Sequence, residues 1–254
     1  MTAFACALAS SSAGNATLFS AGSTHILLDA GISKRMLTQS LAAFSLSVYD
    51  LSAVLITHEH GDHTACLPYI PPHLPVYASF GASVHIKSSP VTPGLPFAVN
   101  DVQITPFATP HDTPDSVGYF LQYGDFSMAL ATDMGYMPDD ALALVKTAQA
   151  LFLESNYDEA MLQAGRYPAF LKRRIAGRLG HLSNNQCAAA ALRCAEGKLR
   201  HLVLMHLSKD NNTPEIAYET TRSHLAEHGA EAGRDFTLQV APRNRPGTPV
   251  YAAS

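Results

Sequence analysis

Three histidines and one aspartate fall within six residues of one short segment. Residues 57–63 read Thr-His-Glu-His-Gly-Asp-His and directly follow a run of four apolar residues. Imidazole nitrogens and carboxylate oxygens are ligands of first-row divalent metals, and four of them at the end of a buried strand suit two such ions. In an extended segment His58 and His60 point to the same side, whereas Asp62 and His63 lie beyond a glycine turn and face a second ion. The segment therefore predicts a metal site rather than a histidine-rich surface loop.

The segment resembles the Thr-His-x-His-x-Asp-His signature of the metallo-β-lactamase superfamily. Other landmarks of that superfamily follow in order, each after an apolar run that predicts a strand. Residues 27–31 resemble the first motif, which ends in a structural aspartate and a glycine turn. The resemblance implies that one ion is held by His58, His60 and His111, that a second is held by Asp62, His63 and His206, and that both are bridged by Asp133.

A further pair, Glu154 and His181, resembles a pair in tRNase Z enzymes. Gly180-His181-Leu182-Ser183 opens an Ala-rich helix, as a Gly-His-Ser-Thr segment does in those enzymes, and Glu154 ends an earlier predicted strand. A carboxylate that orients an imidazole raises its pKa, which suits a proton donor to a leaving alkoxide. The alternative is that His181 is an ordinary residue at a helix start capped by Ser183.

The resemblance narrows to the WalJ/YycJ-type branch of the superfamily and covers nearly the whole chain. It rests on Ser-Ser-Ser-Ala-Gly-Asn-Ala-Thr at 10–17, Glu-Ser-Asn-Tyr-Asp at 154–158, Tyr-Pro with Leu-Lys-Arg-Arg-Ile within 167–175, and Gly-His-Leu-Ser-Asn at 180–184. Members of this branch resemble exonucleases that act on DNA. Ala13 stands where a glycine is usual, which leaves the metal residues unaffected. The long arm with which tRNase Z grips tRNA is absent, which argues against tRNA 3′ processing.

Charge is distributed unevenly along the chain. Residues 1–165 carry 4 Lys/Arg and 14 Asp/Glu, whereas residues 166–254 carry 13 Lys/Arg and 7 Asp/Glu. A basic segment beside a metal site suits a phosphodiester polymer, and we expect Lys172, Arg173 and Arg174 to hold phosphates next to the cleaved bond. The alternative is a solvated helix face.

Strand and helix patterns alternate along the chain, which indicates an α/β or α+β fold. We expect strands near residues 3–8, 16–20, 25–29, 53–57, 101–107, 117–123, 126–132, 150–154, 201–207 and 236–241. We expect helices near 33–43, 138–148, 168–178, 183–196 and 214–228, with Thr213 as the N-cap of the last, and loops at 67–75 and 90–96. The superfamily resemblance implies an αβ/βα four-layer sandwich, and without a linker we expect one domain over residues 1–254.

Length and composition fit a globular chain with a large core. Of 254 residues, 47% are apolar, and no apolar run reaches the ~20 residues that span a bilayer. The apolar N-terminus lacks the basic residues of a signal peptide, so we expect it to form the first strand. The four cysteines form no Cys-x-x-Cys pair, and Cys187 and Cys194 share one helix face as buried thiols, which favours a reducing cytoplasm. We expect Cys66 to be a packing residue.

The sequence thus predicts a hydrolase of phosphodiesters with two divalent ions, Zn²⁺ or Mn²⁺, and DNA as the expected substrate. In this mechanism Asp62 orients or deprotonates the attacking water, and His181, held by Glu154, protonates the leaving oxygen. Neither a membrane nor an obligate protein partner is expected. Three alternatives remain open: a phosphodiesterase of small cyclic phosphates, a thioester or lactam hydrolase, and a non-enzymatic metal-binding protein.

Overall fold

The computed structural model describes residues 3–83 and 87–252 and resolves two compact units. Unit 1 comprises Met1–Phe107, Thr113–Phe126 and Ala241–Ser254, and unit 2 comprises Ala108–Asp112 and Ser127–Val240. The prediction of a single domain over residues 1–254 stays a prediction.

Unit 1 contains a seven-stranded mixed sheet. Its order is β14 (Val250–Tyr251), β1 (Phe4–Ala9), β2 (Ala16–Ala21), β3 (Thr24–Leu28), β4 (Ala53–Ile56), β5 (Val76–Ser79) and β6 (Ser89–Val91). The pairs from β14 to β3 are antiparallel, and those from β3 to β6 are parallel. Because β3 and β4 are parallel neighbours, the residues that follow them emerge at the same edge of the sheet.

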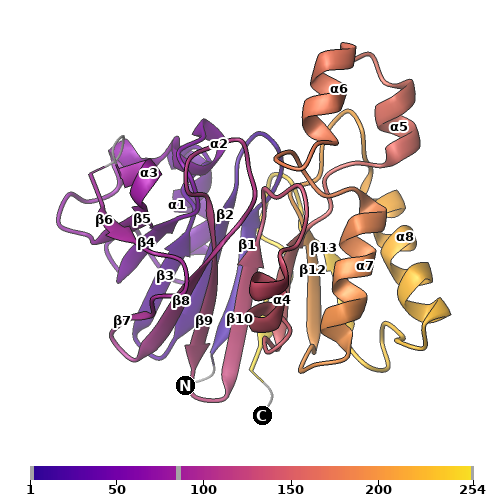
Figure 1. Ribbon diagram of the computed structural model, residues 1–254. Helices are drawn as coiled ribbons and strands as arrows, with labels where there is room; N and C mark the ends of the chain where they lie inside the picture. The colour runs from indigo at the N-terminus through magenta and orange to yellow at the C-terminus, as the bar shows by residue number, and fades with distance from the viewer. Residues whose placement is uncertain (1–2, 84–86, 253–254) are drawn as a thin grey trace. The chain divides into compact units, whose positions relative to one another are not determined.

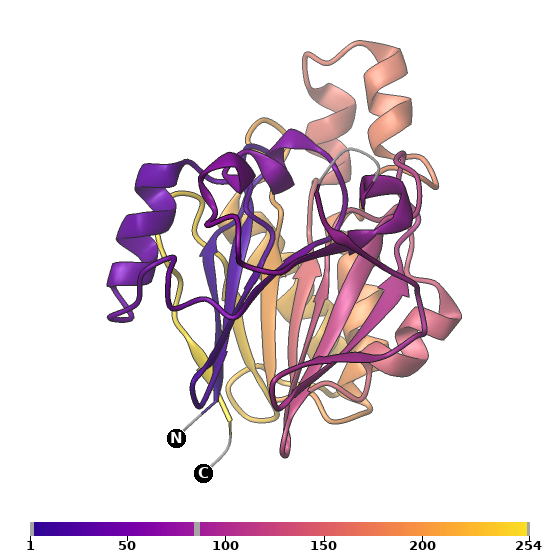
Figure 2. The same ribbon diagram turned by 90° about the vertical axis from the view of Figure 1, so that its left-hand side faces the viewer.

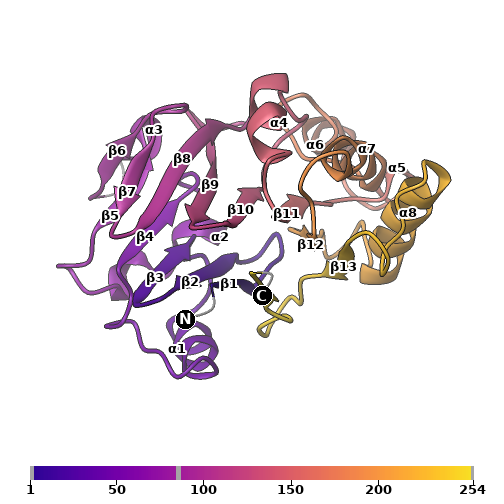
Figure 3. The same ribbon diagram turned by 90° about the horizontal axis from the view of Figure 1, so that it is seen from below.

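Helix α1 (Lys34–Ala42) covers one face of this sheet, as Figure 3 shows. Ser33 caps the helix by accepting a hydrogen bond from the Met36 backbone, and Leu37 and Leu41 are buried in a core cluster with residues of β1 to β4. The other elements of this part of the chain are α2 (Gly61–Thr64), the 3₁₀ helix η1 (Leu67–Tyr69), α3 (Phe80–Ser83), β7 (Phe97–Val99), β8 (Val102–Ala108) and β9 (Val117–Tyr123).

Unit 2 is built on four neighbouring parallel strands. They are, in order, β10 (Phe126–Ala131), β11 (Ala150–Glu154), β12 (His201–Met205) and β13 (Thr237–Val240). The helices are α4 (Asp139–Val145), α5 (Glu159–Ala164), α6 (Ala169–Ile175), α7 (Asn184–Ala195) and α8 (Pro214–Glu227). Figure 1 shows α7 and α8 lying side by side, and Figure 2 shows α5 and α6 as a separate neighbouring pair. The parallel order brings the carboxyl ends of β10, β11 and β12 to one edge.

Every strand and helix predicted from the sequence is present, with ends that differ by a few residues. The N-terminal segment is strand β1, Thr213 caps α8, and Cys66, Cys187 and Cys194 are buried. The loop predicted at 90–96 is wrong at its start, because β6 includes Pro90; an edge strand tolerates a proline, whose nitrogen has no hydrogen to donate. The loop predicted at 67–75 contains one 3₁₀ turn, η1. Among the described residues, no helix combines the length and apolarity needed to cross a membrane.

Candidate metal centre

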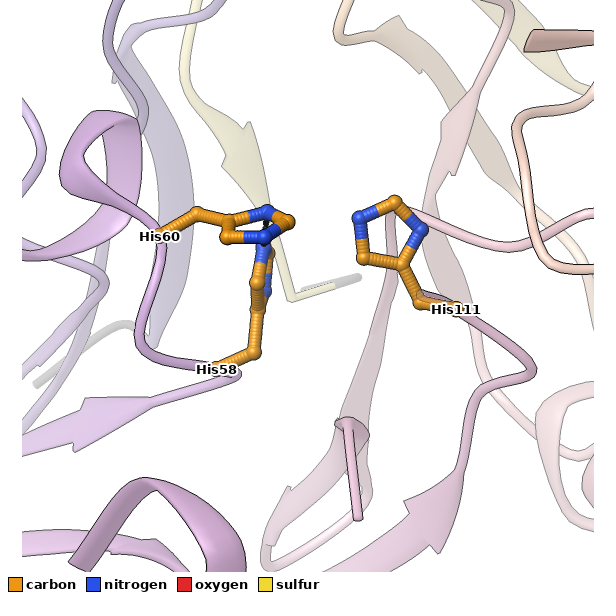
Figure 4. A group of neighbouring side chains, drawn as sticks. All are labelled: His58, His60 and His111. Carbon is orange, nitrogen blue, oxygen red and sulfur yellow. Dashed lines mark hydrogen bonds between the residues drawn. The ribbon is translucent and has the colours of Figure 1, made fainter. Parts of the chain in front are cut away.

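In unit 1, the candidate ligands follow the end of β4 and continue into helix α2. A glycine turn was expected at Gly61, and in the structure Gly61 is the first residue of α2. Asp62 and His63 therefore lie in one helical turn, whose N-cap is His60. His58 Nε2 lies 3.0 Å from His60 Nδ1, and Figure 4 shows these two rings, with His111 of unit 2 labelled in the same view. Metal–nitrogen bonds of about 2.0–2.1 Å place two imidazole ligands of one ion about 3 Å apart, so this pair fits one ion.

Asp29 orients the histidines of unit 1. Its carboxylate accepts hydrogen bonds from the Thr57 backbone nitrogen at 2.9 Å and the Thr57 hydroxyl at 3.0 Å, and lies 2.8 Å from His63 Nδ1. Because the Thr57 hydroxyl donates to Asp29, it accepts from His58 Nδ1, 3.0 Å away. These contacts leave Nε2 of both rings as the ligating nitrogen, and His63 Nε2 lies 3.5 Å from Asp62 Oδ2.

Backbone contacts hold helix α2 against the residue that precedes β2 and the segment that follows β3. Asn15 N donates to Asp62 O, and Ala30 N donates to His63 O, both at 2.8 Å. A Cβ at Gly31 would lie 1.5 Å from Asp62 O, so a side chain there would displace the helix. The glycine of the first superfamily motif is therefore required by this close approach.

In unit 2, Asp133 and His206 occupy strained backbone positions at the strand ends. Both have positive φ, 57° for Asp133 and 56° for His206, a region that non-glycine residues rarely adopt. Both side chains are buried. Strain of this kind costs on the order of 1–3 kcal/mol and persists where the surrounding structure fixes a functional side chain.

Glu154 is the most extensively bonded side chain of the cluster. Its Oε1 accepts hydrogen bonds from His181 Nδ1 and His206 Nδ1, both at 2.8 Å, and its Oε2 accepts from the Met134 and Leu182 backbone nitrogens, both at 3.1 Å. Burial raises the pKa of Glu154, but the adjacent His181 and the hydrogen bonds from both imidazoles outweigh this effect and lower it. Four accepted bonds indicate an orienting carboxylate rather than a metal ligand.

His181 is the most exposed member of this cluster. Its side chain is 20% exposed, against 2% or less for Asp133, Glu154 and His206. Burial lowers the pKa of His181, but the charge and hydrogen bond of Glu154, together with Asp133, raise it above the ordinary value. This ring is therefore both protonated more readily and open to an incoming molecule.

His111 faces the same cluster within unit 2. Its Nδ1 lies 3.1 Å from Gly180 O, and its Nε2 lies 3.3 Å from Asp112 Oδ1 and 3.8 Å from Asp133 Oδ1. Burial lowers its pKa despite the neighbouring carboxylates, which favours the neutral ring that binds metals. The second carboxylate oxygen of Asp112 accepts a hydrogen bond from Arg174.

The cluster of unit 2 suits a divalent ion held by Asp133 and His206, with Glu154 as the carboxylate that orients His206. One potential ligand atom from each of Asp133, Glu154, His181 and His206 lies within 4.8 Å of the others. Two carboxylates buried in one cluster are stable only beside positive charge, which imidazolium groups and a divalent ion supply. The set lacks thiolates, so it does not distinguish zinc from manganese.

Each unit brings its own predicted site residues together. Unit 1 gathers His58, His60, Asp62 and His63, and unit 2 gathers His111, Asp133, Glu154, His181 and His206. The sharing of ions between these two sets stays a prediction. The three basic residues lie on α6, where Lys172 donates to Gln163 O at 2.6 Å, Arg174 pairs with Asp112, and Arg173 is exposed.

Several orienting residues were not predicted from the sequence. Asn156 Nδ2 donates to His206 O at 2.8 Å, and Thr57 and Asp112 make the contacts described above. Asn15 lies beside His63, and its Nδ2 donates to Ser11 O at 2.9 Å. Asn15, Asn156 and Thr57 all lie inside the segments that carry the superfamily resemblance, which is the signal that could have identified them.

Comparison with known proteins places the chain in a family. The model of the β-lactamase superfamily domain matches residues 24–207. The chain belongs to this superfamily. It is 34% identical over 243 residues to the exodeoxyribonuclease YycJ of Bacillus anthracis, which covers 91% of this chain and 92% of the relative, so it belongs to the same branch.

Solved structures agree on the fold. The metallo-β-lactamase fold protein YhfI of Bacillus subtilis matches with a TM-score of 0.73 and 16% identity, covering 99% of this chain and 100% of that protein. The Zn²⁺-bound PqqB of Methylobacterium extorquens matches with a TM-score of 0.69 and 17% identity, covering 96% and 99%. The predicted α/β sandwich of the metallo-β-lactamase fold is confirmed, and the chain is a metal-dependent hydrolase.

Proposed function

We propose that this enzyme hydrolyses phosphodiester bonds of DNA as an exonuclease. The observation that carries the proposal is the His181–Glu154 pair, which lies against Asp133 and His206 in unit 2. A thioester releases a thiolate, which leaves without a proton, whereas a phosphodiester of DNA releases a poor alkoxide leaving group that needs a proton donor. The name of the relative YycJ, an exodeoxyribonuclease, supports DNA as the substrate.

In this proposal, two divalent ions, Zn²⁺ or Mn²⁺, bind the predicted ligands. His58, His60 and His111 would hold one, Asp62, His63 and His206 would hold the other, and Asp133 would contribute a ligand to both. Such ions lower the pKa of a coordinated water and polarise phosphoryl oxygens. The zinc in the solved PqqB structure supports a site for such ions in this fold.

The residues of the chain move two protons in this reaction. Asp62 orients the attacking water and accepts its proton as the new P–O bond forms. His181 donates the proton on its Nε2 to the departing oxygen as the old P–O bond breaks, because its Nδ1 proton is held by Glu154. Arg173 binds a neighbouring phosphate, whereas Lys172 and Arg174 also anchor α6 through Gln163 and Asp112.

A substrate panel tests the proposal. The metal-loaded protein is incubated with end-labelled single- and double-stranded DNA and RNA, with bis-p-nitrophenyl phosphate, and with nitrocefin. We expect stepwise shortening of DNA and no hydrolysis of nitrocefin. Turnover of the small diester alone would favour a small-molecule phosphodiesterase, and hydrolysis of nitrocefin alone would exclude the phosphodiester assignment.

We also propose where in the cell the enzyme acts and which molecule it binds. All four cysteines are free and buried thiols, which supports the predicted reducing cytoplasm. Nucleic acid is the proposed partner, bound as substrate.

A further inference from the structure

Three large hydrophobic side chains are exposed among the described residues of unit 2. They are Tyr136 at 37%, Phe170 at 66% and Leu179 at 55%. Tyr136 follows the metal-cluster residue Asp133 by three positions, and Leu179 precedes His181 by two. Tyr136 and Leu179 are thus exposed apolar side chains close in the sequence to candidate site residues.

Two of these side chains, Phe170 and Leu179, lie in a stretch of the sequence whose charged residues are all basic. Residues 160–195 contain no Asp or Glu, but six basic residues: Arg166, Lys172, Arg173, Arg174, Arg178 and Arg193. A surface that combines aromatic rings with basic side chains is complementary to single-stranded nucleic acid, whose bases stack and whose phosphates are negative.

Helix α6 presents an aromatic ring and an arginine on one face. Phe170 and Arg173 are three residues apart, a spacing that makes neighbours on a helix surface. Arg173 is exposed and makes no ion pair with any residue that the structure describes. Arg174, the next residue on this face, is held by Asp112, which itself lies 3.3 Å from His111 Nε2. The face is therefore fixed to the cluster of unit 2 through one ion pair.

Arg178 is held in place by Tyr136. Its guanidinium carbon lies 4.4 Å from the centre of the Tyr136 ring, a cation–π contact that limits the freedom of the arginine. The loop that contains Tyr136 and the loop that contains Arg178 touch closely, since a Cβ at Gly135 would lie 2.3 Å from the Arg178 carbonyl carbon. Arg178 thus offers a positioned positive charge three residues from His181.

We propose that α6 and these two loops form a platform for unpaired nucleotides at a strand end. Phe170 stacks on a base, and Arg173 and Arg178 bind the phosphates on either side of the nucleotide. The inference rests on the proposed phosphodiester function and adds its substrate class, a strand whose end is single-stranded. A small diester has neither a base to stack nor a second phosphate.

An abasic substrate separates stacking from charge. Binding of the metal-loaded protein to a labelled single-stranded DNA is measured by fluorescence anisotropy, with a matched strand that lacks the bases of its last three nucleotides. Phe170→Ala should weaken binding of the normal strand about 5- to 150-fold, the usual range for loss of one base–aromatic stack. It should leave the abasic strand nearly unaffected.

Arginine and control variants complete the experiment. Arg173→Ala should weaken both strands alike and reduce the slope of log affinity against log salt by about 0.7. Phe170→Leu keeps the apolar volume and removes the aromatic ring, so it should behave as Phe170→Ala even if the alanine variant folds poorly. Tyr49→Ala, in unit 1 and 77% exposed, should change neither affinity.

Equal losses on the normal and abasic strands, or no loss on either, would overturn the platform. This result is independent of the exonuclease proposal, which fails if the wild-type protein leaves every DNA intact while hydrolysing another substrate. The anisotropy measurement needs no cleavage, so it decides the platform in either case.

Discussion

At the residue scale, Glu154 links two functions that the sequence suggested separately. The sequence predicts it as the partner of His181, but the same oxygen also accepts from His206. A carboxylate in this position fixes the tautomer of a ligating histidine and raises its basicity. One buried side chain therefore positions both a candidate metal ligand and a candidate proton donor.

Glu154→Gln and His181→Ala should differ in metal content. The glutamine loses the charge that holds both imidazoles, so the affinity for metal should fall about 10- to 100-fold. In His181→Ala, the contact between Glu154 and His206 remains, so both ions should be retained. Elemental analysis after dialysis at controlled free metal measures this, and equal metal loss in both variants would contradict the separate roles.

Asp133→Ala should remove at least one of two bound ions. The strained backbone at Asp133 and its burial beside His206 place its carboxylate in the cluster. Purified wild-type protein should contain about two divalent ions per chain, and metal should raise its thermal stability, because an ion that binds only the folded state stabilises it. A wild-type protein that binds no metal after reconstitution would contradict the proposed centre.

Site residues with a motif could be predicted from the sequence, but their orienting partners could not. The His and Asp ligands stand out by type and spacing, and Glu154 by its resemblance to tRNase Z. Asn15 and Asn156 contact histidines that lie far away in the chain. Asp112 contacts the adjacent His111 through the direction of its side chain. The spacing of residues in the sequence encodes neither kind of contact.

At the element scale, the N-terminus of α7 determines where His181 emerges. Ser183 and Gln186 form a capping box, and the Ser183 hydroxyl also donates to Glu159 at 2.8 Å. Ser183→Ala should lower the free energy of unfolding by about 0.5–2 kcal/mol, as measured by urea denaturation. Ser12→Ala, exposed and outside any helix, is the control, and equal stabilities of the two variants would rule out the cap.

The elements that were not predicted are all short, although the four-residue strands β4 and β13 were predicted. Strands β5, β6, β7 and β14 have four residues or fewer, too few to show a period of two, and β6 contains a proline. Helices α2 and α3 are single turns of four residues, and α5 has six. These elements are stabilised by their neighbours in the unit rather than by intrinsic propensity.

At the scale of the whole molecule, the buried thiols report on the stability of each unit. Burial raises the pKa of Cys6 in unit 1, and of Cys187 and Cys194 in unit 2, to about 12. A thiol reacts as its thiolate, so these residues should resist iodoacetamide at pH 8 until their unit opens.

If the two units share their ions, as proposed, metal should protect all three thiols together. Alkylation followed by mass spectrometry, with and without a chelator, measures the rate at each cysteine. Removal of metal should accelerate labelling of Cys6 and of Cys187 by similar factors. Acceleration confined to one unit would contradict a single domain with shared ions.

We propose that His181 protonates a leaving alkoxide, and this role is tested by how the rate lost in His181→Ala depends on the leaving group. The turnover of His181→Ala and wild type is compared on DNA and on bis-p-nitrophenyl phosphate, at equal metal content. We expect turnover to fall about 10²- to 10⁴-fold on DNA and much less on the small diester, because p-nitrophenolate leaves without a proton. Equal losses on both substrates would contradict the claim and remove His181 from the role of proton donor.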